Sequence, residues 1–310
     1  MINKPLVSVL IPCYNCEPYV REAVMSIMRQ SYANLEILVI DDGSTDNTGN
    51  ILKKLAEEDT RIVYIKNEKN LKLIATLNKG LDLCKGKYIA RMDADDISVP
   101  TRIEKQVDFL EKHPNIGVVG TYTKNFGANN RTWKMETKDK YIRTNLLFSS
   151  CFAHPAVMMR TSVLRDNHLY YNTDYPHAED YKLWCDIAQY TELANIPEVL
   201  LHYRINKNQV SYKYHKKQKE TAQKIRKEYI NNFLTKKDIP IRFSAQSDTN
   251  DIRKLKDYIK EKYILKKILL AWYDSFENKE NLIKSLTLSN IFDIGLIDSL
   301  RIIFHKVIKK

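Results

Sequence analysis

Lys87-Tyr88-Ile89-Ala90-Arg91-Met92-Asp93-Ala94-Asp95-Asp96 is a short, mostly apolar stretch that ends in three carboxylates within four residues. The apolar part is typical of a buried β-strand. Carboxylates buried together disfavour each other's ionisation, so packing alone does not explain them. Mg²⁺ and Mn²⁺ prefer oxygen ligands and commonly bind one or two carboxylates together with substrate phosphates. The stretch therefore predicts a metal site for a nucleotide diphosphate, whereas a solvated turn before Pro100 is the simpler alternative.

Two earlier apolar runs also end in polar residues. Residues 35–40 lead into Asp41-Asp42-Gly43-Ser44-Thr45-Asp46, where Gly43 permits a tight turn and Asp41 is expected to support it. Residues 6–11 lead into Pro12-Cys13-Tyr14-Asn15. Ligands of open α/β sheets bind beyond the carboxyl ends of the strands. The polar side chains expected at that edge are Tyr14, Asp42, Asp93 and Asp95.

Helix and strand patterns alternate along residues 1–210. Helices are expected over 19–30, 48–58, 74–84, 100–112 and 181–190, and further strands over 62–65 and 116–123. This alternation predicts an α/β fold with a mostly parallel sheet flanked by helices. The first strand is not followed by Gly-x-Gly-x-x-Gly, which disfavours a dinucleotide-binding oxidoreductase, and the sequence has no P-loop motif.

Charge separates the last third from the rest. The chain has 310 residues and a formal net charge of +12, and residues 211–310 hold 23 Lys+Arg against 12 Asp+Glu, a net of +11. Strand patterns are scarce there, and helices are expected over 213–234 and 251–276. We therefore expect a catalytic domain over residues 1–210 and a helical, basic region over residues 211–310.

The end of the chain is amphipathic. Residues 294–310 place apolar side chains near helical spacing and add cationic ones. Such a segment suits an anionic membrane surface, and a helix packed on its own domain is an equal alternative. No nucleic-acid-binding motif accompanies the charge, so nucleic acid is not an expected partner. The sequence has neither a secretory signal nor an apolar run long enough to span a bilayer, which predicts a cytoplasmic location.

Five segments, taken in this order, resemble family 2 glycosyltransferases with the GT-A fold. They are Ser8-Val9-Leu10-Ile11-Pro12-Cys13-Tyr14-Asn15, Ile40-Asp41-Asp42-Gly43-Ser44-Thr45-Asp46, Ala90-Arg91-Met92-Asp93-Ala94-Asp95-Asp96, His154-Pro155-Ala156-Val157-Met158 and Ala178-Glu179-Asp180-Tyr181. The resemblance covers roughly residues 5–210 and is strongest to bacterial enzymes of lipopolysaccharide or capsule synthesis. It implies inverting transfer of a hexosyl or N-acetylhexosaminyl group from a nucleotide-diphosphate donor, most simply a UDP-sugar. The implied cofactor is Mn²⁺ or Mg²⁺, the implied acceptor is a glycan or lipid-linked saccharide, and the implied location includes the inner face of the bacterial membrane.

The resemblance also implies roles for single residues. Asp180 matches the general base that takes the acceptor's proton, and its neighbour Glu179 has helix capping as an alternative role. Asp95 is expected to bind metal together with Asp93. Donor contacts are expected from Pro12, Tyr14, Asn15, Asp42, Arg91 and Asp93. Candidate acceptor or phosphate contacts are His154, Glu179, Trp184 and Arg204, although a structural role is equally open for His154 and burial in the core is favoured for Trp184.

Two positions depart from the family pattern, and two other functions stay open. Asn206 stands where relatives often have histidine, and Lys72 where they usually have glycine. A sugar nucleotidyltransferase is one alternative function, but it would commonly carry a glycine-rich, basic loop after the first strand. A non-catalytic membrane- or polyanion-binding protein is the other, and it leaves the acidic motifs unexplained.

Overall fold

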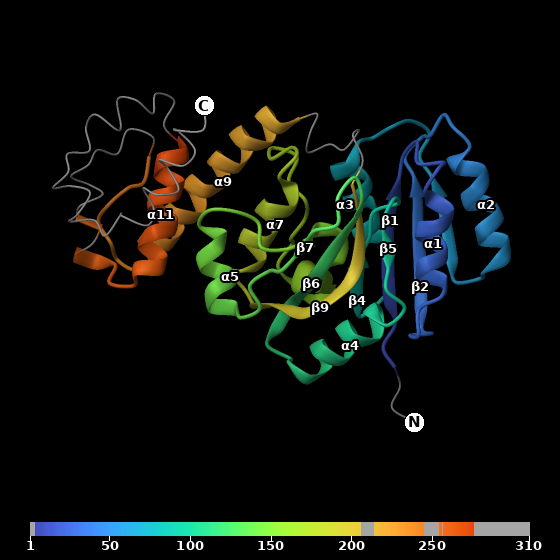
Figure 1. The fold of residues 1–310 in the computed structure, drawn as a ribbon, viewed down its shortest axis with the longest axis horizontal. Coiled ribbons are helices and arrows are strands. Elements are labelled where there is room, and N and C mark those ends of the chain that lie inside the picture. The colour runs from blue at the N-terminus through green and yellow to red at the C-terminus, as the bar shows by residue number, and fades with distance from the viewer. Residues whose placement is uncertain (1–3, 206–213, 245–253, 256, 276–310) are drawn as a thin grey trace. The chain divides into compact units, whose positions relative to one another are not determined.

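The computed structural model describes residues 4–205, 214–244, 254–255 and 257–275 (Figure 1). The chain divides into two compact units, one of Met1–Ile142 with Ser150–Gln218 and one of Arg143–Ser149 with Lys219–Lys310. The amphipathic segment 294–310 and Asn206 lie outside the described residues. Among the described helices, none combines the length and the apolar character needed to cross a membrane.

One sheet of nine described strands forms the centre of the first unit. Four strands at one side are parallel: β3 (Ile62–Lys66), β2 (Leu35–Asp41), β1 (Val7–Cys13) and β4 (Tyr88–Arg91). Next to β4, β8 (Met158–Arg160) runs antiparallel to both β4 and β6 (Ile116–Gly127). β6 pairs in parallel with β9 (Glu192–Ile205). Two short strands are antiparallel to their partners: β5 (Ile97–Ser98) pairs with β9, and β7 (Thr132–Trp133) pairs with β6. The sheet is therefore parallel from β3 to β4 and mixed beyond β4.

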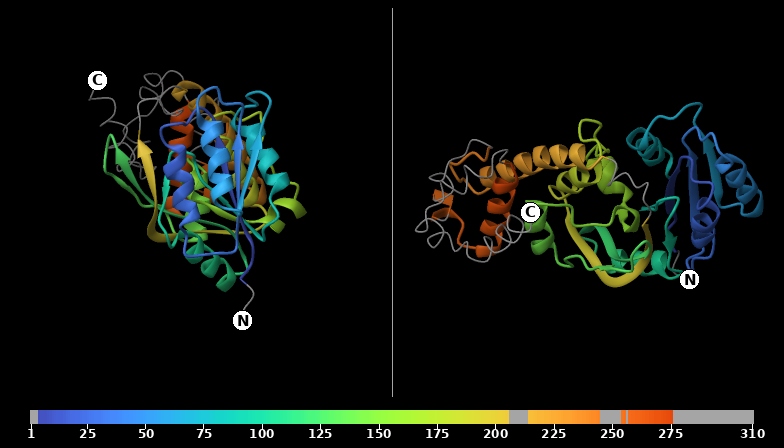
Figure 2. Two further views of the ribbon diagram at one scale, coloured as in Figure 1. Left: turned by 90° about the vertical axis from the view of Figure 1, so that its right-hand side faces the viewer. Right: turned by 45° about the horizontal axis from the view of Figure 1, so that its top comes forward.

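Helices lie on both sides of the parallel strands (Figures 1 and 2). Successive side chains of a strand point to opposite faces of the sheet, so each face packs against its own helices. Val9 and Ile11 of β1 belong to one apolar core with α1 (Val20–Met28) and α2 (Thr48–Glu58). Leu10 points the other way and meets Gly80 of α3 (Leu73–Leu83), where an added Cβ would lie 2.2 Å from Leu10 Cδ1. Gly80 therefore lets α3 approach the sheet closely.

The later half of the first unit supplies the remaining helices. They are α4 (Arg102–Lys112), the start of α5 (Asp139–Leu146), the 3₁₀ turn η1 (His154–Ala156), α6 (Thr161–Asp166) and α7 (Glu179–Ile187). The predicted α/β class is confirmed, and the helix expected over 48–58 coincides with α2. The sequence pattern did not predict β5, β7, β8 or β9, and the helix expected over 181–190 begins two residues earlier.

The second unit has its own apolar core. It is built mainly from α9 (His215–Lys236) and α11 (Lys262–Ser275). Its buried residues include Leu147, Ile230, Leu234, Phe243, Leu255, Leu265, Ile268 and Trp272. Arg226 forms an ion pair with Asp274, so part of the basic charge of this region is paired within the unit.

Candidate active site at the acidic loop

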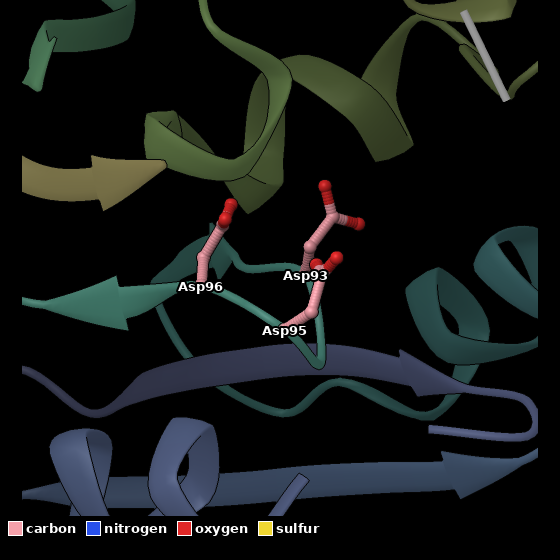
Figure 3. Close-up of side chains that lie close together, drawn as sticks. All are labelled: Asp93, Asp95 and Asp96. Atoms are coloured by element: carbon pink, nitrogen blue, oxygen red, sulfur yellow. The ribbon is translucent and has the colours of Figure 1, made fainter. Parts of the chain in front are cut away.

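The loop between β4 and β5 gathers three carboxylates. Asp93, Asp95 and Asp96 each offer one oxygen, and these oxygens all lie within 4.8 Å of one another. Figure 3 shows the three side chains projecting to the same side of the loop. Burial, and then the charge of Asp93, raise the pKa of Asp95 to about 6. The loop therefore concentrates negative charge in a small, partly buried volume.

Asp96 is the most buried of the three, with 1% of its surface exposed. Its Oδ1 accepts a hydrogen bond from the backbone N–H of Arg204 at 2.8 Å. Its Oδ2 finds no hydrogen-bond partner in the described part of the chain. Burial raises the pKa of this carboxyl well above its usual range. An orphaned carboxylate oxygen beside two further carboxylates is an arrangement that fits a divalent cation.

Arg91 is the cation that the chain itself places here. Its Nη2 lies 2.5 Å from Asp93 Oδ1, and its side chain is almost completely buried. Nε and Nη1 have no hydrogen-bond partner among the described residues. Burial, the largest single influence, opposes its charge, but Asp93, Tyr171 and Asp96 together outweigh burial and the pKa of Arg91 is raised. Two buried donors with nothing to bind suit an anionic ligand at this place.

A second acidic pair opens α7. Burial, and then the charge of Asp180, raise the pKa of Glu179 to about 7. Burial also raises the pKa of Asp180, while the backbone N–H of Tyr181 and the charge of Arg91 oppose this. The charge of Arg91 acts on Glu179 as well, so both acidic groups lie within reach of one buried arginine. A carboxylate with a raised pKa, close to a reaction centre, is suited to accept a proton.

His154 and Trp184 lie beside this pair in a packed aromatic group. His154 Nε2 is 2.8 Å from the hydroxyl of Tyr171. Burial, followed by the charge of Arg91, lowers the pKa of His154 well below its usual value, which favours a neutral ring at pH 7. Trp184 is fully buried and meets His154 and Phe152 edge to face. Trp184 therefore lies in the core, the position that was favoured for it, and its ring has no exposed face for an acceptor.

Asp41 and Asp42, at the end of β2, are held by hydrogen bonds from neighbouring loops. Asp42 Oδ1 accepts hydrogen bonds from Asn67 Nδ2 and the Leu71 N–H, each at 2.8 Å, and Asp42 Oδ2 accepts one from the Lys72 N–H at 3.0 Å. Asp41 Oδ1 accepts one from the Ser44 N–H at 2.9 Å, so it supports the turn as expected. Asp42 therefore fixes the loop before α3, whatever else it binds.

The end of β1 presents one exposed aromatic ring. Tyr14 is 47% exposed. Asn15 has a φ of 47°, its N–H donates to Ser44 Oγ at 3.0 Å, and its Oδ1 accepts from the Thr45 N–H at 2.9 Å. Pro12 lies within β1, opposite Ile40. These bonds join the loops after β1 and β2 and leave the Tyr14 ring available for stacking.

Arg204, a candidate acceptor or phosphate contact, binds the acidic loop directly. Its Nε donates to the Asp95 carbonyl at 2.7 Å and its Nη2 pairs with Glu22 at 2.6 Å. The guanidinium also lies over the rings of Tyr19 and Phe126, at 4.6 and 4.4 Å from their centroids. Its contacts are thus with the protein, and they tie the acidic loop to α1 and β9.

Two further findings were not predicted. Burial, and then the charges of Asp93, Asp96 and Asp95, raise the pKa of Tyr203, so its phenol lies beside the acidic loop. The only sequence signal for Tyr203 was its place before Arg204. Lys72 has a φ of 74°, in the region that favours glycine, which gives a physical reason for the glycine usual at this position.

Comparisons with known proteins place the chain among enzymes of one family. The profile described as Glycosyl transferase family 2 matches residues 8–167. A glycosyltransferase of Haemophilus influenzae is 41% identical over 290 residues, covering 89% of this chain and 88% of the relative. The Escherichia coli enzyme UDP-Glc:alpha-D-GlcNAc-diphosphoundecaprenol beta-1,3-glucosyltransferase WfaP is 30% identical over 220 residues, covering 66% of this chain and 80% of that enzyme.

A solved structure shows the same fold. Residues 1–349 of TarS from S. aureus, in complex with UDP-GlcNAc, superpose with a TM-score of 0.62, covering 90% of this chain and 91% of that chain. Sequence identity to TarS is 18%, so this likeness concerns the fold alone. The GT-A fold predicted from the sequence is confirmed.

Proposed function

Because the chain belongs to glycosyltransferase family 2, we propose that it is a metal-dependent, inverting enzyme that transfers one sugar from a UDP-sugar to a saccharide hydroxyl. The glycan that it extends is of the lipopolysaccharide or capsule type. The observation that carries this proposal is the acidic loop, where three carboxylates lie together and one buried oxygen of Asp96 has no partner in the described chain.

The acidic loop fits Mg²⁺ or Mn²⁺. Asp95 and Asp93 would hold the ion, and Asp96 belongs to the same cluster of carboxylates. All three are carboxylate oxygens, the ligand type that these hard cations prefer. Bound there, the ion would offset negative charge on the departing diphosphate. Arg91 would add a second, permanent positive charge through its two unpartnered nitrogens.

The donor nucleotide is assigned to the ends of β1 and β2. Tyr14 offers an exposed ring for a base, and Asp42 has acceptor capacity left on its carboxylate for a ring N–H. Asn15 and Pro12 shape the loop beside them. Two comparisons support uracil as the base, since WfaP is named as using UDP-Glc and TarS was solved with UDP-GlcNAc.

Asp180 is assigned the role of general base, which removes the proton from the acceptor hydroxyl. The attacking hydroxyl must lose its proton as the new bond forms, and a carboxylate with a raised pKa accepts it near neutral pH. One displacement assisted by a base, with no covalent intermediate, inverts the anomeric centre. Glu179, with a pKa of about 7, would be partly protonated beside Asp180 and so limits the repulsion between them.

The acceptor is proposed to be lipid-linked and the enzyme to work at an anionic membrane surface. The net charge of +11 in residues 211–310 supports this, as does the diphosphoundecaprenol acceptor in the name of WfaP. In this proposal residues 1–210 are the catalytic domain and residues 211–310 the membrane-facing region. Binding to anionic vesicles should weaken as salt rises, and a truncation before Ile294 tests the amphipathic segment.

A thermal-shift panel tests the function most directly. UDP, GDP and their sugars are added with Mn²⁺, with Mg²⁺ or with EDTA, because a ligand that binds the folded state raises its melting temperature. UDP with metal should give the largest rise. Transfer from the matching UDP-sugar is then followed by UDP release. Equal stabilisation by every nucleotide, or turnover that EDTA does not reduce, would contradict the proposal.

A further inference from the structure

Trp133 differs from the other two tryptophans of the chain. Trp184 and Trp272 are 0% and 4% exposed, whereas Trp133 is 47% exposed. It lies in the two-residue strand β7, which the neighbouring strand β6 holds through the pair Thr123–Trp133. Leaving a large aromatic ring in water forgoes the free energy that its burial would contribute. A tryptophan that a paired strand presents to solvent is therefore a candidate binding residue.

The Trp133 ring is stacked on Tyr203. Their centroids are 6.1 Å apart and their planes differ by 16°. Tyr203 is more deeply buried, and its phenol feels the charges of Asp93, Asp96 and Asp95. The aromatic pair therefore runs from the acidic loop outward to solvent. A ligand lying on Trp133 would be close to the reaction centre.

The strand between these two rings carries polar groups on the same face. Directly paired residues of neighbouring strands share a face, so Thr123 lies with Trp133, and Asn125 lies with Tyr203. Thr123 Oγ1 and Asn125 Oδ1 are buried and have no hydrogen-bond partner among the residues that the structure describes. A purely structural aromatic cover would be expected to lie over apolar side chains. The rings here share their face with polar side chains instead, and Trp133 remains exposed to a ligand.

The place of the pair in the sheet points to the acceptor rather than the donor. Tyr14 and Asp42 follow β1 and β2, while Trp133 and Tyr203 belong to β7 and β9, on the other side of β4 in the strand order. The acidic loop that follows β4 lies between them in this order. We propose that Trp133 and Tyr203 form a stacking platform for the terminal sugar ring of the acceptor, an inference that rests on the proposed function. The C–H bonds of a pyranose face would meet the electron-rich ring of Trp133.

Fluorescence tests binding without relying on turnover. Iodide quenches exposed indoles, so most of the quenching should come from Trp133. The probe is an α-D-GlcNAc diphosphate with a short alkyl chain, added to the full chain in the presence of UDP and Mn²⁺. It should reduce iodide quenching of the wild type, and Trp133→Phe should lack the quenchable component. Unchanged quenching at saturating probe would overturn the platform.

Kinetics then assign the platform to the acceptor. Trp133→Ala should raise the acceptor KM by roughly 5- to 10-fold while the donor KM and the melting temperature change little. Trp133→Phe keeps a stacking ring and should restore most of the loss. Tyr190→Ala is the matched control, because Tyr190 is 58% exposed and lies just before the opposite end of β9 from Tyr203.

The outcomes separate the two proposals. A wild-type acceptor KM in Trp133→Ala, or a rise in the donor KM alone, would overturn the platform while leaving the glycosyltransferase intact. Failure of the wild type to use any UDP-sugar would refute the proposed function instead. In that case protection of Trp133 by the probe would still support saccharide binding at the platform.

Discussion

Two strands of one sheet, β2 and β4, lead into pairs of adjacent aspartates, Asp41–Asp42 and Asp95–Asp96. The two pairs differ in how the protein binds their carboxylates. Asp42, beyond β2, accepts three hydrogen bonds from the loop before α3, and Asp41 accepts one from the turn that follows. Beyond β4, Asp96 keeps one buried oxygen without a partner in the described residues, and the pKa of Asp95 is raised to about 6. The protein therefore holds the first pair with several hydrogen bonds, whereas it leaves one buried oxygen of Asp96 without a partner among the described residues.

The difference shows what an acidic motif can mean. A carboxylate that accepts several N–H bonds is stable as an anion and can shape a loop. A buried carboxylate that lacks such bonds needs a proton or a cation from outside. We therefore expect substitution of Asp42 to lower the free energy of unfolding and substitution of Asp96 to raise it. We also expect the first pair to affect nucleotide binding and the second to affect metal binding and transfer.

The largest effect is expected from Asp95→Ala. This change removes one of the three carboxylates of the proposed metal site, and transfer should fall by roughly 10⁴-fold or more if several kcal/mol of transition-state stabilisation is lost. Calorimetry should show weaker Mn²⁺ binding. Asp82→Ala is the control, because Asp82 is an exposed acid whose carboxylate accepts a hydrogen bond from the Tyr170 hydroxyl. Full activity of Asp95→Ala in EDTA would refute the metal site.

Asp180→Asn tests the second acidic pair, at the start of α7. The amide keeps the size of the side chain but cannot take a proton, so turnover should fall by roughly 10²–10⁴-fold. UDP affinity, measured by calorimetry, should survive. If donor binding were lost and turnover changed little, Asp180 would have a structural role. Greater damage from Glu179→Gln would exchange the two assignments.

Stability should respond in opposite directions to Asp42→Asn and Asp96→Asn. At Asp42 the amide replaces an acceptor with a donor that faces other donors, which should cost about 1–3 kcal/mol. At Asp96 the amide removes a poorly solvated charge and can donate to neighbouring carboxylates, so the metal-free protein should gain stability. Urea unfolding in EDTA measures both. Equal destabilisation of both variants would refute the idea that the protein stabilises the charge of Asp42 but not that of Asp96. Asp42→Ala should in addition weaken UDP binding if Asp42 reads the base.

The titration of Glu179 should be visible in the pH dependence of the protein's stability. Its pKa is raised from 4.5 to about 7, so the folded state holds this proton more tightly than the unfolded state. The stability linked to this proton is present below pH 4.5 and is lost as pH rises towards 7. In Glu179→Gln that loss should vanish, and the melting temperature should fall less between pH 4.5 and 7. Parallel melting curves for the two proteins would exclude this titration.

Local patterns were enough to predict the parallel part of the fold. The runs before Asp42 and Asp95 are apolar because β2 and β4 are buried on both faces, and that signal depends only on neighbouring residues. The long strand β9 was missed because half of its residues are polar or partly exposed and its partner β6 is far away in sequence. Pairing at such a distance leaves little trace in a local pattern.

The candidate site was predictable as a set of motifs but not as a network. Sequence spacing could place Asp93 and Asp95 on one loop. It could not show that Arg204, more than a hundred residues later, binds the same loop through the Asp95 carbonyl and ties it to Glu22 of α1. It also gave no signal for Trp133, because the neighbour that makes this residue informative, Tyr203, lies on another strand.

The smallest effect is expected from Lys72→Gly, which acts on the loop that holds Asp42. The Lys72 N–H reaches Asp42 only because Lys72 adopts a φ of 74° and a ψ of 160°, a conformation almost confined to glycine. Glycine would keep this hydrogen bond without the strain of a side chain. We expect a gain of about 1 kcal/mol in the free energy of unfolding, reduced somewhat by the greater freedom of glycine in the unfolded chain. Lys69→Gly controls for the lost charge. A destabilised Lys72→Gly would mean that the lysine side chain contributes more to the loop than its backbone strain costs.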